Sequence, residues 1–158
     1  MPKFHSLRVK DLYKDTEQCS VIEFAIPEDL KHTFKYKAGQ YLTLRETVNG
    51  EDIRRSYSLC SSPIDDEWKV AVKQITDGKF STYVNQFLKK DDILQVMKPM
   101  GRFGTAISEI PKNYIVFTAG SGITPILSMI KTHLAKEPNS TFKLFYLNRT
   151  VKSIIFKE

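Results

Sequence analysis

The residues best suited to chemistry form the run Arg55-Ser56-Tyr57-Ser58, in a segment with strand character. Alternation along a strand places Arg55 and Tyr57 on one face and the two serines on the other. A guanidinium fork suits phosphate, an aromatic face suits a flat ring, and hydroxyls suit polar ring atoms. A flavin nucleotide offers all three partners, so a flavin site is one interpretation of the run, which by itself is a weak signal. The alternative is a surface arginine beside a half-buried tyrosine.

A second run, Gly78-Lys79-Phe80-Ser81, opens a predicted helix whose apolar stripe falls at positions 80, 83, 84, 87 and 88. Backbone N–H groups at a helix start attract anions, and a serine hydroxyl adds a further donor. Gly78 allows close approach of the backbone to a phosphate. Lys73 lies in the strand just before. The run predicts a phosphate site, and a plain turn with Ser81 as its cap is the alternative.

A third run, Gly120-Ser121-Gly122-Ile123-Thr124-Pro125, lies between a predicted strand at 114–117 and a predicted helix at 123–134. A glycine turn in this position presents N–H groups to a pyrophosphate, although Pro125 stands where a third glycine is usual. A tight turn without a ligand is the alternative. Another strand is predicted at 142–147. The apolar run 114–117 is expected to be covered on both faces.

These motifs require two different scaffolds. Short strands are predicted at 7–13, 20–26, 41–45, 52–61, 68–75 and 92–96, with Asn49-Gly50 as a two-residue hairpin turn. Together with the helix after Gly78 they predict a six-stranded antiparallel barrel over 1–104, followed by a linker at 105–111. The 47 residues of 112–158 predict only the first βαβ part of a doubly wound domain, which usually takes roughly 100 residues. We therefore expect a fragment of a longer protein.

Composition excludes several classes of protein. The chain has 158 residues, 24 Lys and Arg against 18 Asp and Glu, a net charge of +6 and 41% hydrophobic residues. This balance excludes a disordered chain, a collagen-like fibre and a small disulfide scaffold. The basic residues are scattered and lack interleaved aromatic residues, so neither nucleic acid nor a membrane is an expected partner.

Cysteine and histidine usage argues against a metal centre in this chain. Cys19 and Cys60 are too few for an iron–sulfur cluster, which takes about four thiolates. His5, His32 and His133 are dispersed, without the spacing of metal ligands. The N-terminus has no export signal, and no apolar run approaches the roughly 20 residues that cross a bilayer. The expected location is the cytoplasm.

Taken together and in this order, the three runs resemble the motifs of the ferredoxin–NADP reductase superfamily. The nearest likeness is to reductase components of ring-oxidising oxygenases, of the phenylacetyl-CoA epoxidase reductase type. The resemblance implies an FAD-binding barrel, hydride transfer from NAD(P)H to FAD, and single electrons passed to an iron–sulfur carrier or ferredoxin and then to an oxygenase. It also implies a [2Fe–2S] domain beyond residue 158. The alternatives are a flavohaemoglobin-type or other electron-transfer reductase of the superfamily, and a non-catalytic flavin-binding or regulatory module.

The resemblance also implies residue roles. Arg55 would bind the flavin pyrophosphate, and three residues would serve the hydride step: Tyr57 against the flavin ring, Ser58 near its N5 atom, and Thr124 facing both rings. The implied flavin-binding set is Arg55, Ser56, Tyr57, Ser58, Ala71, Lys73, Gly78, Lys79, Phe80, Ser81 and Thr124. The implied NAD(P)-binding set is Gly120, Ser121, Gly122, Ile123, Thr124, Pro125 and Arg149. NADH is favoured, and the choice between NADH and NADPH stays open.

Overall fold

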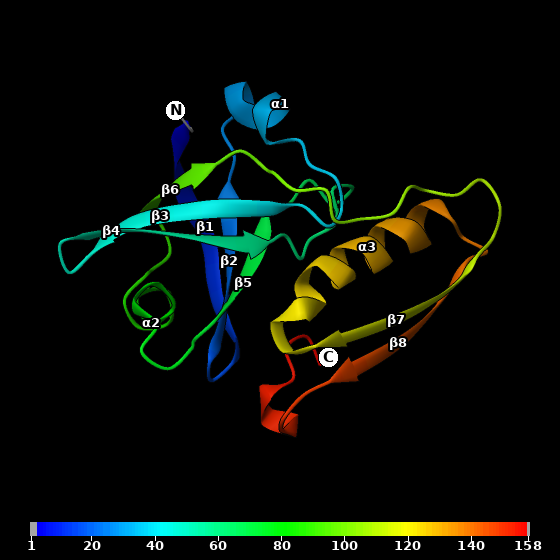
Figure 1. Cartoon of the computed structure of the whole chain (residues 1–158). Helices are drawn as coiled ribbons and strands as arrows, with labels where there is room; N and C mark the ends of the chain where they lie inside the picture. Colours follow the sequence, from blue (N-terminus) through cyan, green and yellow to red (C-terminus); the bar gives the residue numbers. More distant parts are fainter. Residues whose placement is uncertain (1–2, 158) are drawn as a thin grey trace.

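The computed structural model describes residues 3–157, as a curled antiparallel sheet joined to a smaller α/β unit (Figure 1). The strands of the large sheet are β1 (Phe4–Thr16), β2 (Cys19–Ala25), β3 (Tyr41–Val48), β4 (Glu51–Ser58), β5 (Lys69–Lys73) and β6 (Ile93–Met97). Their order across the sheet is β4-β3-β6-β1-β2-β5, and every neighbouring pair is antiparallel. The six-stranded antiparallel sheet is therefore confirmed.

The sheet curls until its two edge strands meet. An isolated bridge between Leu59 and Val70 joins the end of β4 to β5. The enclosed core is apolar, and its largest fully buried side chains include Phe24, Phe34 and Phe80. Burial of these rings drives the closure, since apolar area contributes roughly 25 cal/mol per Å² removed from water.

The β3–β4 hairpin forms at the predicted position. Asn49 and Gly50 have φ values of 51° and 80°, and Val48 pairs with Glu51 across the turn. Positive φ at both central residues matches the right-handed twist of the flanking strands. The turn sets the register that brings Tyr57 opposite Leu42 and Ser58 opposite Tyr41.

Two helical segments differ from the sequence-based expectation. A short 3-10 turn (Glu28–Leu30) leads into the one-turn helix α1 (Lys31–Phe34), and neither was predicted. The helix predicted to run through residue 88 is α2 (Lys79–Gln86), which ends two residues earlier. The N–H groups of Phe87 and Leu88 both bond to the Tyr83 carbonyl, at 2.9 and 3.1 Å. The chain turns there, so Phe87 is 62% exposed while Leu88 is buried.

The α/β unit consists of two parallel strands and one helix. Its elements are β7 (Asn113–Ala119), a 3-10 turn (Gly120–Gly122), α3 (Ile123–Lys136), β8 (Thr141–Leu147) and a second 3-10 turn (Val151–Ser153). The helix packs on one face of the strand pair (Figure 1). The expectation that 114–117 is covered on both faces is wrong, because no described element lies on the other face. That open face exposes Ile115, Phe117, Phe145 and Leu147.

Apolar and polar contacts together fix α3 against the barrel. Ile123 and Ile126 of the helix pack with Cys19, Val21 and Ala71 of the sheet. At the next turns of the helix, the Ser128 hydroxyl donates to the Ser61 carbonyl at 2.6 Å, and the Ser62 and Thr132 hydroxyls lie 2.9 Å apart. Both cysteines are free and buried, and burial raises the pKa of the Cys60 thiol to about 12.

A buried carboxylate ties the loop after residue 104 to the far end of α3. Glu137 accepts hydrogen bonds from the Ser108 N–H at 2.7 Å, from Ser140 Oγ at 2.8 Å and from the Tyr114 hydroxyl at 3.0 Å. His133 Nδ1 lies 2.8 Å from the same carboxylate. Burial acts to raise the pKa of Glu137, but the hydrogen bonds to its carboxylate have the larger combined effect. The pKa is therefore lowered from 4.5 to about 2.

This lowered pKa predicts a loss of stability in acid. As pH falls from about 5 to about 2, the unfolded state takes up the proton first, so the carboxylate's contribution to stability is lost across that window. In Glu137→Gln we expect a lower free energy of unfolding at pH 7 and a flatter profile over the acid range. Urea unfolding between pH 2.5 and 7 measures both. The control is Glu109→Gln, which removes an exposed carboxylate next to Ser108. If the free energy of unfolding falls with acid equally steeply in wild type and in Glu137→Gln, the lowered pKa does not belong to Glu137.

Candidate functional site

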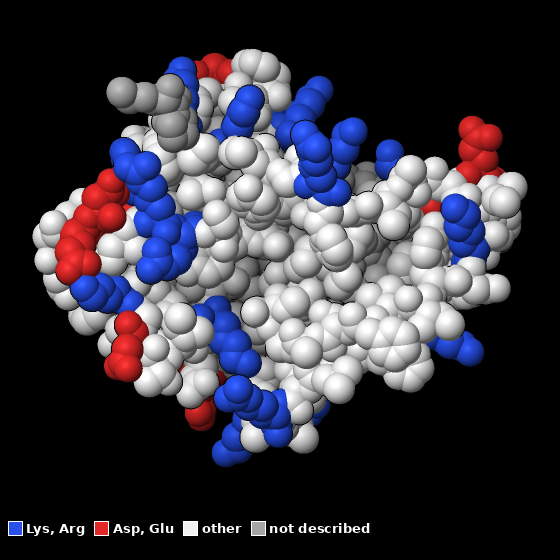
Figure 2. All heavy atoms as spheres, in the orientation of Figure 1, with Lys and Arg blue, Asp and Glu red and all other residues white. Residues whose placement is uncertain are grey.

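A cleft of about 780 Å³ lies along the free edge of the sheet, between β4, β5 and the start of α2. We call it the edge cleft. Most of the predicted flavin-binding residues line it: Arg55, Ser56, Tyr57, Ala71, Lys73, Gly78, Lys79, Phe80 and Ser81. Of the predicted set, Ser58 and Thr124 are outside this lining. In Figure 2 the charged side chains concentrate on the barrel half of this face, with Lys and Arg outnumbering Asp and Glu.

Arg55 and Lys73 are the two cations of the edge cleft that have no acidic partner among the described residues. Two other cations there are paired: Arg54 with Asp52 at 2.9 Å and Lys79 with Glu51 at 2.6 Å. Arg55 has no acidic partner among the described residues, and its Nη1 donates only to the Arg54 carbonyl, at 2.7 Å. The remaining N–H groups of its fork are free to bind an anion.

Tyr57 lies one strand repeat further along the same face, supported by the core. Its ring stacks on Phe80, with centroids 6.0 Å apart and planes 28° apart. Burial raises the pKa of Tyr57 to about 12, against the opposing effect of Arg55, so its hydroxyl stays protonated at neutral pH. Phe80 is only 1% exposed and forms the base beneath Tyr57. The pair supplies a firm aromatic surface at one end of the cleft.

The Gly78–Ser81 turn is tightly built. A side chain at Gly78 would overlap the side chains of Ile75 and Ser81. The Ser81 hydroxyl accepts from the Ile75 N–H at 3.2 Å and donates to the Gly78 carbonyl at 3.0 Å. These bonds close the turn before α2, and Ser81 does not cap the helix, whose start has no side-chain cap hydrogen bond. Phosphate binding by this turn stays a prediction.

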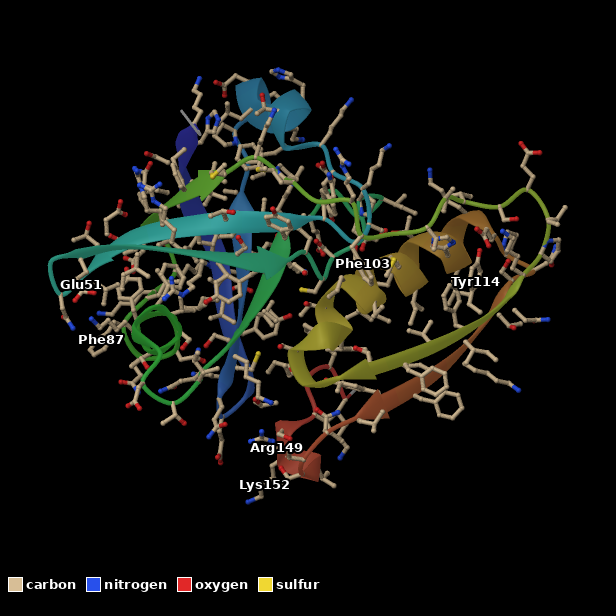
Figure 3. All side chains as sticks on the ribbon, viewed as in Figure 1. Glu51, Phe87, Phe103, Tyr114, Arg149 and Lys152 are labelled. Atoms are coloured by element: carbon tan, nitrogen blue, oxygen red, sulfur yellow. The ribbon has the colours of Figure 1, made fainter. Side chains whose placement is uncertain are left out.

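A second cleft of about 810 Å³ lies between the barrel and the α/β unit, and we call it the junction cleft. It is lined by the predicted residues Gly120, Ser121 and Arg149. Figure 3 shows Arg149 near the C-terminal end of the chain, below the barrel. The two clefts share Lys73, Ile75, Thr76 and Ser121 in their linings, so they adjoin. Neither polar atom of the Asn148 carboxamide, which also lines the junction cleft, finds a hydrogen-bond partner among residues 3–157.

Several predicted residues lie beside the clefts without lining them. Thr124 is 5% exposed, and its hydroxyl donates to the Ser121 carbonyl at 3.0 Å. Ile123 belongs to the packed junction with the barrel. Gly122, Pro125 and Ser58 are also outside both linings. The roles of these residues remain predictions.

Other lining residues were missed at the sequence level. Ile75 and Thr76 line both clefts, and Asp77 lines the edge cleft. The sequence held a signal for these residues. Only four residues separate Lys73 from Gly78, which are both predicted to bind the ligand, so the residues between them must also lie near it. Glu51 gave no such signal, since its partner Lys79 is 28 positions away.

The fold and the comparisons with known proteins identify the chain as an FAD-binding oxidoreductase domain of the ferredoxin-reductase type. The family described as oxidoreductase FAD-binding domain matches residues 7–104, and the chain belongs to this family. It is 42% identical, over its full length, to a component of the 1,2-phenylacetyl-CoA epoxidase of Escherichia coli K12, and covers 45% of that protein. It is also 37% identical to the ferredoxin reductase component of 3-ketosteroid-9-alpha-monooxygenase of Rhodococcus rhodochrous. That alignment covers 96% of this chain and 43% of the relative.

The structural comparison agrees with the sequence comparison. Phthalate dioxygenase reductase, described as carrying electrons from pyridine nucleotides to [2Fe–2S], superposes with a TM-score of 0.80 at 28% identity, over 97% of this chain and 46% of that one. The chain thus spans less than half the length of each of these three relatives. In the described part of the chain, no helix is long and apolar enough to cross a membrane.

Proposed function

We propose that the chain binds FAD in the edge cleft and NAD(P)H in the junction cleft, as the flavin-reducing part of an electron-transfer reductase. The observation that carries this proposal is the adjacency of the two clefts, which share Lys73 and Ser121. A hydride donor and its acceptor must bring their rings into contact. Adjoining clefts on either side of one junction allow this.

The residues present fit these two nucleotides. Arg55 supplies a guanidinium that has no acidic partner among residues 3–157 and so suits a pyrophosphate, and Tyr57 supplies an aromatic surface. The unpartnered Asn148 carboxamide and the exposed Arg149 suit the polar groups of a second nucleotide. The chemistry that a bound FAD supplies is acceptance of a hydride and release of single electrons. The protein's task is to hold and orient the two rings.

The wider activity rests on the relatives. We propose that single electrons pass to an iron–sulfur carrier, as a [2Fe–2S] domain of the longer protein or a separate ferredoxin, and from there to an oxygenase. Two relatives are named as components of an epoxidase and a monooxygenase, which supports this acceptor class. The proposed boundaries are 1–104 for the flavin domain, 105–111 for the linker and 112–158 for the nucleotide unit. NAD(P)H use and two free thiols suit the cytoplasm.

The first test is an absorbance spectrum of the purified chain after incubation with FAD and removal of free flavin. Retained flavin absorbance, with FAD released on denaturation and identified by its mass, is the expected result. Anaerobic addition of NADH or NADPH then tests reduction by loss of the flavin absorbance, and comparison of the two gives the coenzyme preference. A protein that takes up no flavin would overturn the proposal.

Gly120→Val separates the two clefts. Gly120 has φ = 51° and open space where a side chain would project, so valine disturbs the turn conformation and protrudes into the junction cleft. We expect unchanged FAD affinity and NAD(P)H binding weakened by about tenfold or more, because returning the disturbed turn to its binding conformation would cost about 1–2 kcal/mol. Flavin fluorescence and nucleotide titration measure the two. Equal loss of both ligands would show that the turn serves only the fold.

A further inference from the structure

A third hollow, of about 760 Å³, is lined by residues from two segments, 33–40 and 98–106. We call it the loop cleft. It shares no lining residue with the edge cleft or the junction cleft. No acidic residue lines it, whereas four cations do: Lys35, Lys37, Lys98 and Arg102. None of the four forms an ion pair with another described residue, so the loop cleft suits a ligand with several negative charges.

One hydroxyl in this lining, that of Thr105, is bonded to a buried imidazole. Thr105 Oγ1 lies 2.9 Å from His133 Nε2, and His133 Nδ1 lies 2.8 Å from Oε1 of Glu137. Thr105 is exposed, whereas His133 and Glu137 are only 1% and 5% exposed. Hydroxyl, imidazole and carboxylate therefore form one hydrogen-bonded chain from the loop cleft into the interior. We call these three residues the Thr105 relay.

The bonds of Glu137 fix the direction of the hydrogen bonds in the relay. Its carboxylate accepts from three further donors and is ionised at neutral pH. An ionised carboxylate can only accept, so His133 Nδ1 must donate to it. In the neutral imidazole, Nε2 is then an acceptor and receives the hydrogen of the Thr105 hydroxyl. His133 is thus placed as a general base for Thr105 Oγ1, which is the arrangement that activates a hydroxyl for nucleophilic attack.

A second hydroxyl of the loop cleft lacks this support and provides a comparison within the same molecule. Thr33 also lines the cleft, and its Oγ1 lies 3.2 Å from His32 Nε2. His32 is exposed, and no carboxylate among residues 3–157 forms an ion pair with its ring. Its orientation and tautomer are therefore not fixed by a buried partner, as those of His133 are.

We propose that Thr105 is an acylation site and that the loop cleft takes an acyl phosphate as the acyl donor. The cations of the cleft suit the phosphate, which is the leaving group. Thr105 Oγ1 attacks the carbonyl carbon, its proton passes to His133 Nε2, and the bond from that carbon to the phosphate oxygen breaks. The phosphate leaves with the bonding electron pair and takes the proton from His133. The product is an ester of Thr105, and the step needs no oxidant or reductant.

The test incubates the full chain with acetyl phosphate and locates the acetyl groups by peptide mass spectrometry. Hydroxylamine cleaves an acetyl ester of threonine but leaves acetyl-lysine intact, so it separates the proposed product from lysine side reactions. We expect Thr105 to be acetylated about 100-fold faster than Thr33 or more, since a positioned general base contributes about 10²–10⁴-fold.

Four variants check the assignment. Thr105→Val should lose the hydroxylamine-sensitive label, and Thr105→Ser should keep it. Thr33→Val is the matched control in the same cleft and should label like wild type. His133→Gln should slow the labelling of Thr105 by about 100-fold or more, with far-UV circular dichroism as the check that this variant is folded.

Several results would overturn the inference. These are labelling of Thr105 and Thr33 at equal rates, labelling of Thr105 at the wild-type rate in folded His133→Gln, and no hydroxylamine-sensitive label on Thr105. A phosphoryl group on Thr105 in place of the acetyl group would show attack at phosphorus and would also overturn it. None of these results bears on the flavin site, which FAD titration of the same protein tests separately.

Discussion

Replacing Arg55 with alanine is expected to weaken FAD binding by about one to two orders of magnitude. The guanidinium has no acidic partner among the described residues, and it projects into the edge cleft beside Tyr57. A charge-assisted hydrogen bond to phosphate is worth about 1.5–3 kcal/mol, and each 1.4 kcal/mol is a factor of about ten in affinity. Titration of the flavin-free protein with FAD, followed by quenching of flavin fluorescence, measures the loss.

Two further variants show whether the loss comes from the phosphate contact. Arg55→Lys keeps the charge but removes the fork, so an intermediate affinity is expected. Arg8→Ala removes the same charge from a surface ion pair with Asp91, outside the edge cleft, and should leave affinity unchanged. If Arg55→Ala retains wild-type affinity, the pyrophosphate of the flavin lies elsewhere.

Gly39→Ala is expected to produce the largest loss of stability, about 3 kcal/mol or more. Gly39 has φ = 91°, a conformation that costs an alanine about 1–2 kcal/mol. Its new Cβ would also overlap the backbone oxygen of Phe103, which cannot move as a side chain can. Overpacking of this kind adds about 1–3 kcal/mol. Urea unfolding followed by far-UV circular dichroism measures the change.

The matched control is Gly50→Ala at the hairpin tip. Gly50 has a similar φ of 80°, but nothing lies within 4 Å of the position of a new Cβ. Only the conformational strain of about 1–2 kcal/mol is therefore expected. Equal losses in the two variants would mean that the loops at 39 and 103 are not in tight contact.

Local rules predicted much of the barrel and of the site. The Asn49-Gly50 turn needs positive φ at both residues, and that requirement is visible in two letters of sequence. The strand with Arg55 and Tyr57 follows directly from the hairpin, so its pairing with the preceding strand was also predictable. The glycines at 78 and 120 lie in turns at the starts of α2 and α3, as predicted.

Features that depend on distant partners were beyond local rules. Phe87 fits the apolar stripe of α2, but the helix ends at Gln86 and the ring points outward. Thr124 has the right neighbours in sequence, yet it is buried against its own turn. The pairing of Lys79 with Glu51 depends on how the hairpin bends toward α2, which no spacing pattern records.

The open face of the β7–β8 pair has a practical consequence for solution work on this chain. Ile115, Phe117, Phe145 and Leu147 are each 49–70% exposed, and the two phenylalanine rings stack at 4.7 Å. Dyes such as anilinonaphthalene sulfonate gain fluorescence on contiguous apolar surface of this kind. The native chain should therefore give a bright dye signal at neutral pH. That signal would resemble a molten globule, so loss of tertiary packing must be judged by near-UV circular dichroism instead.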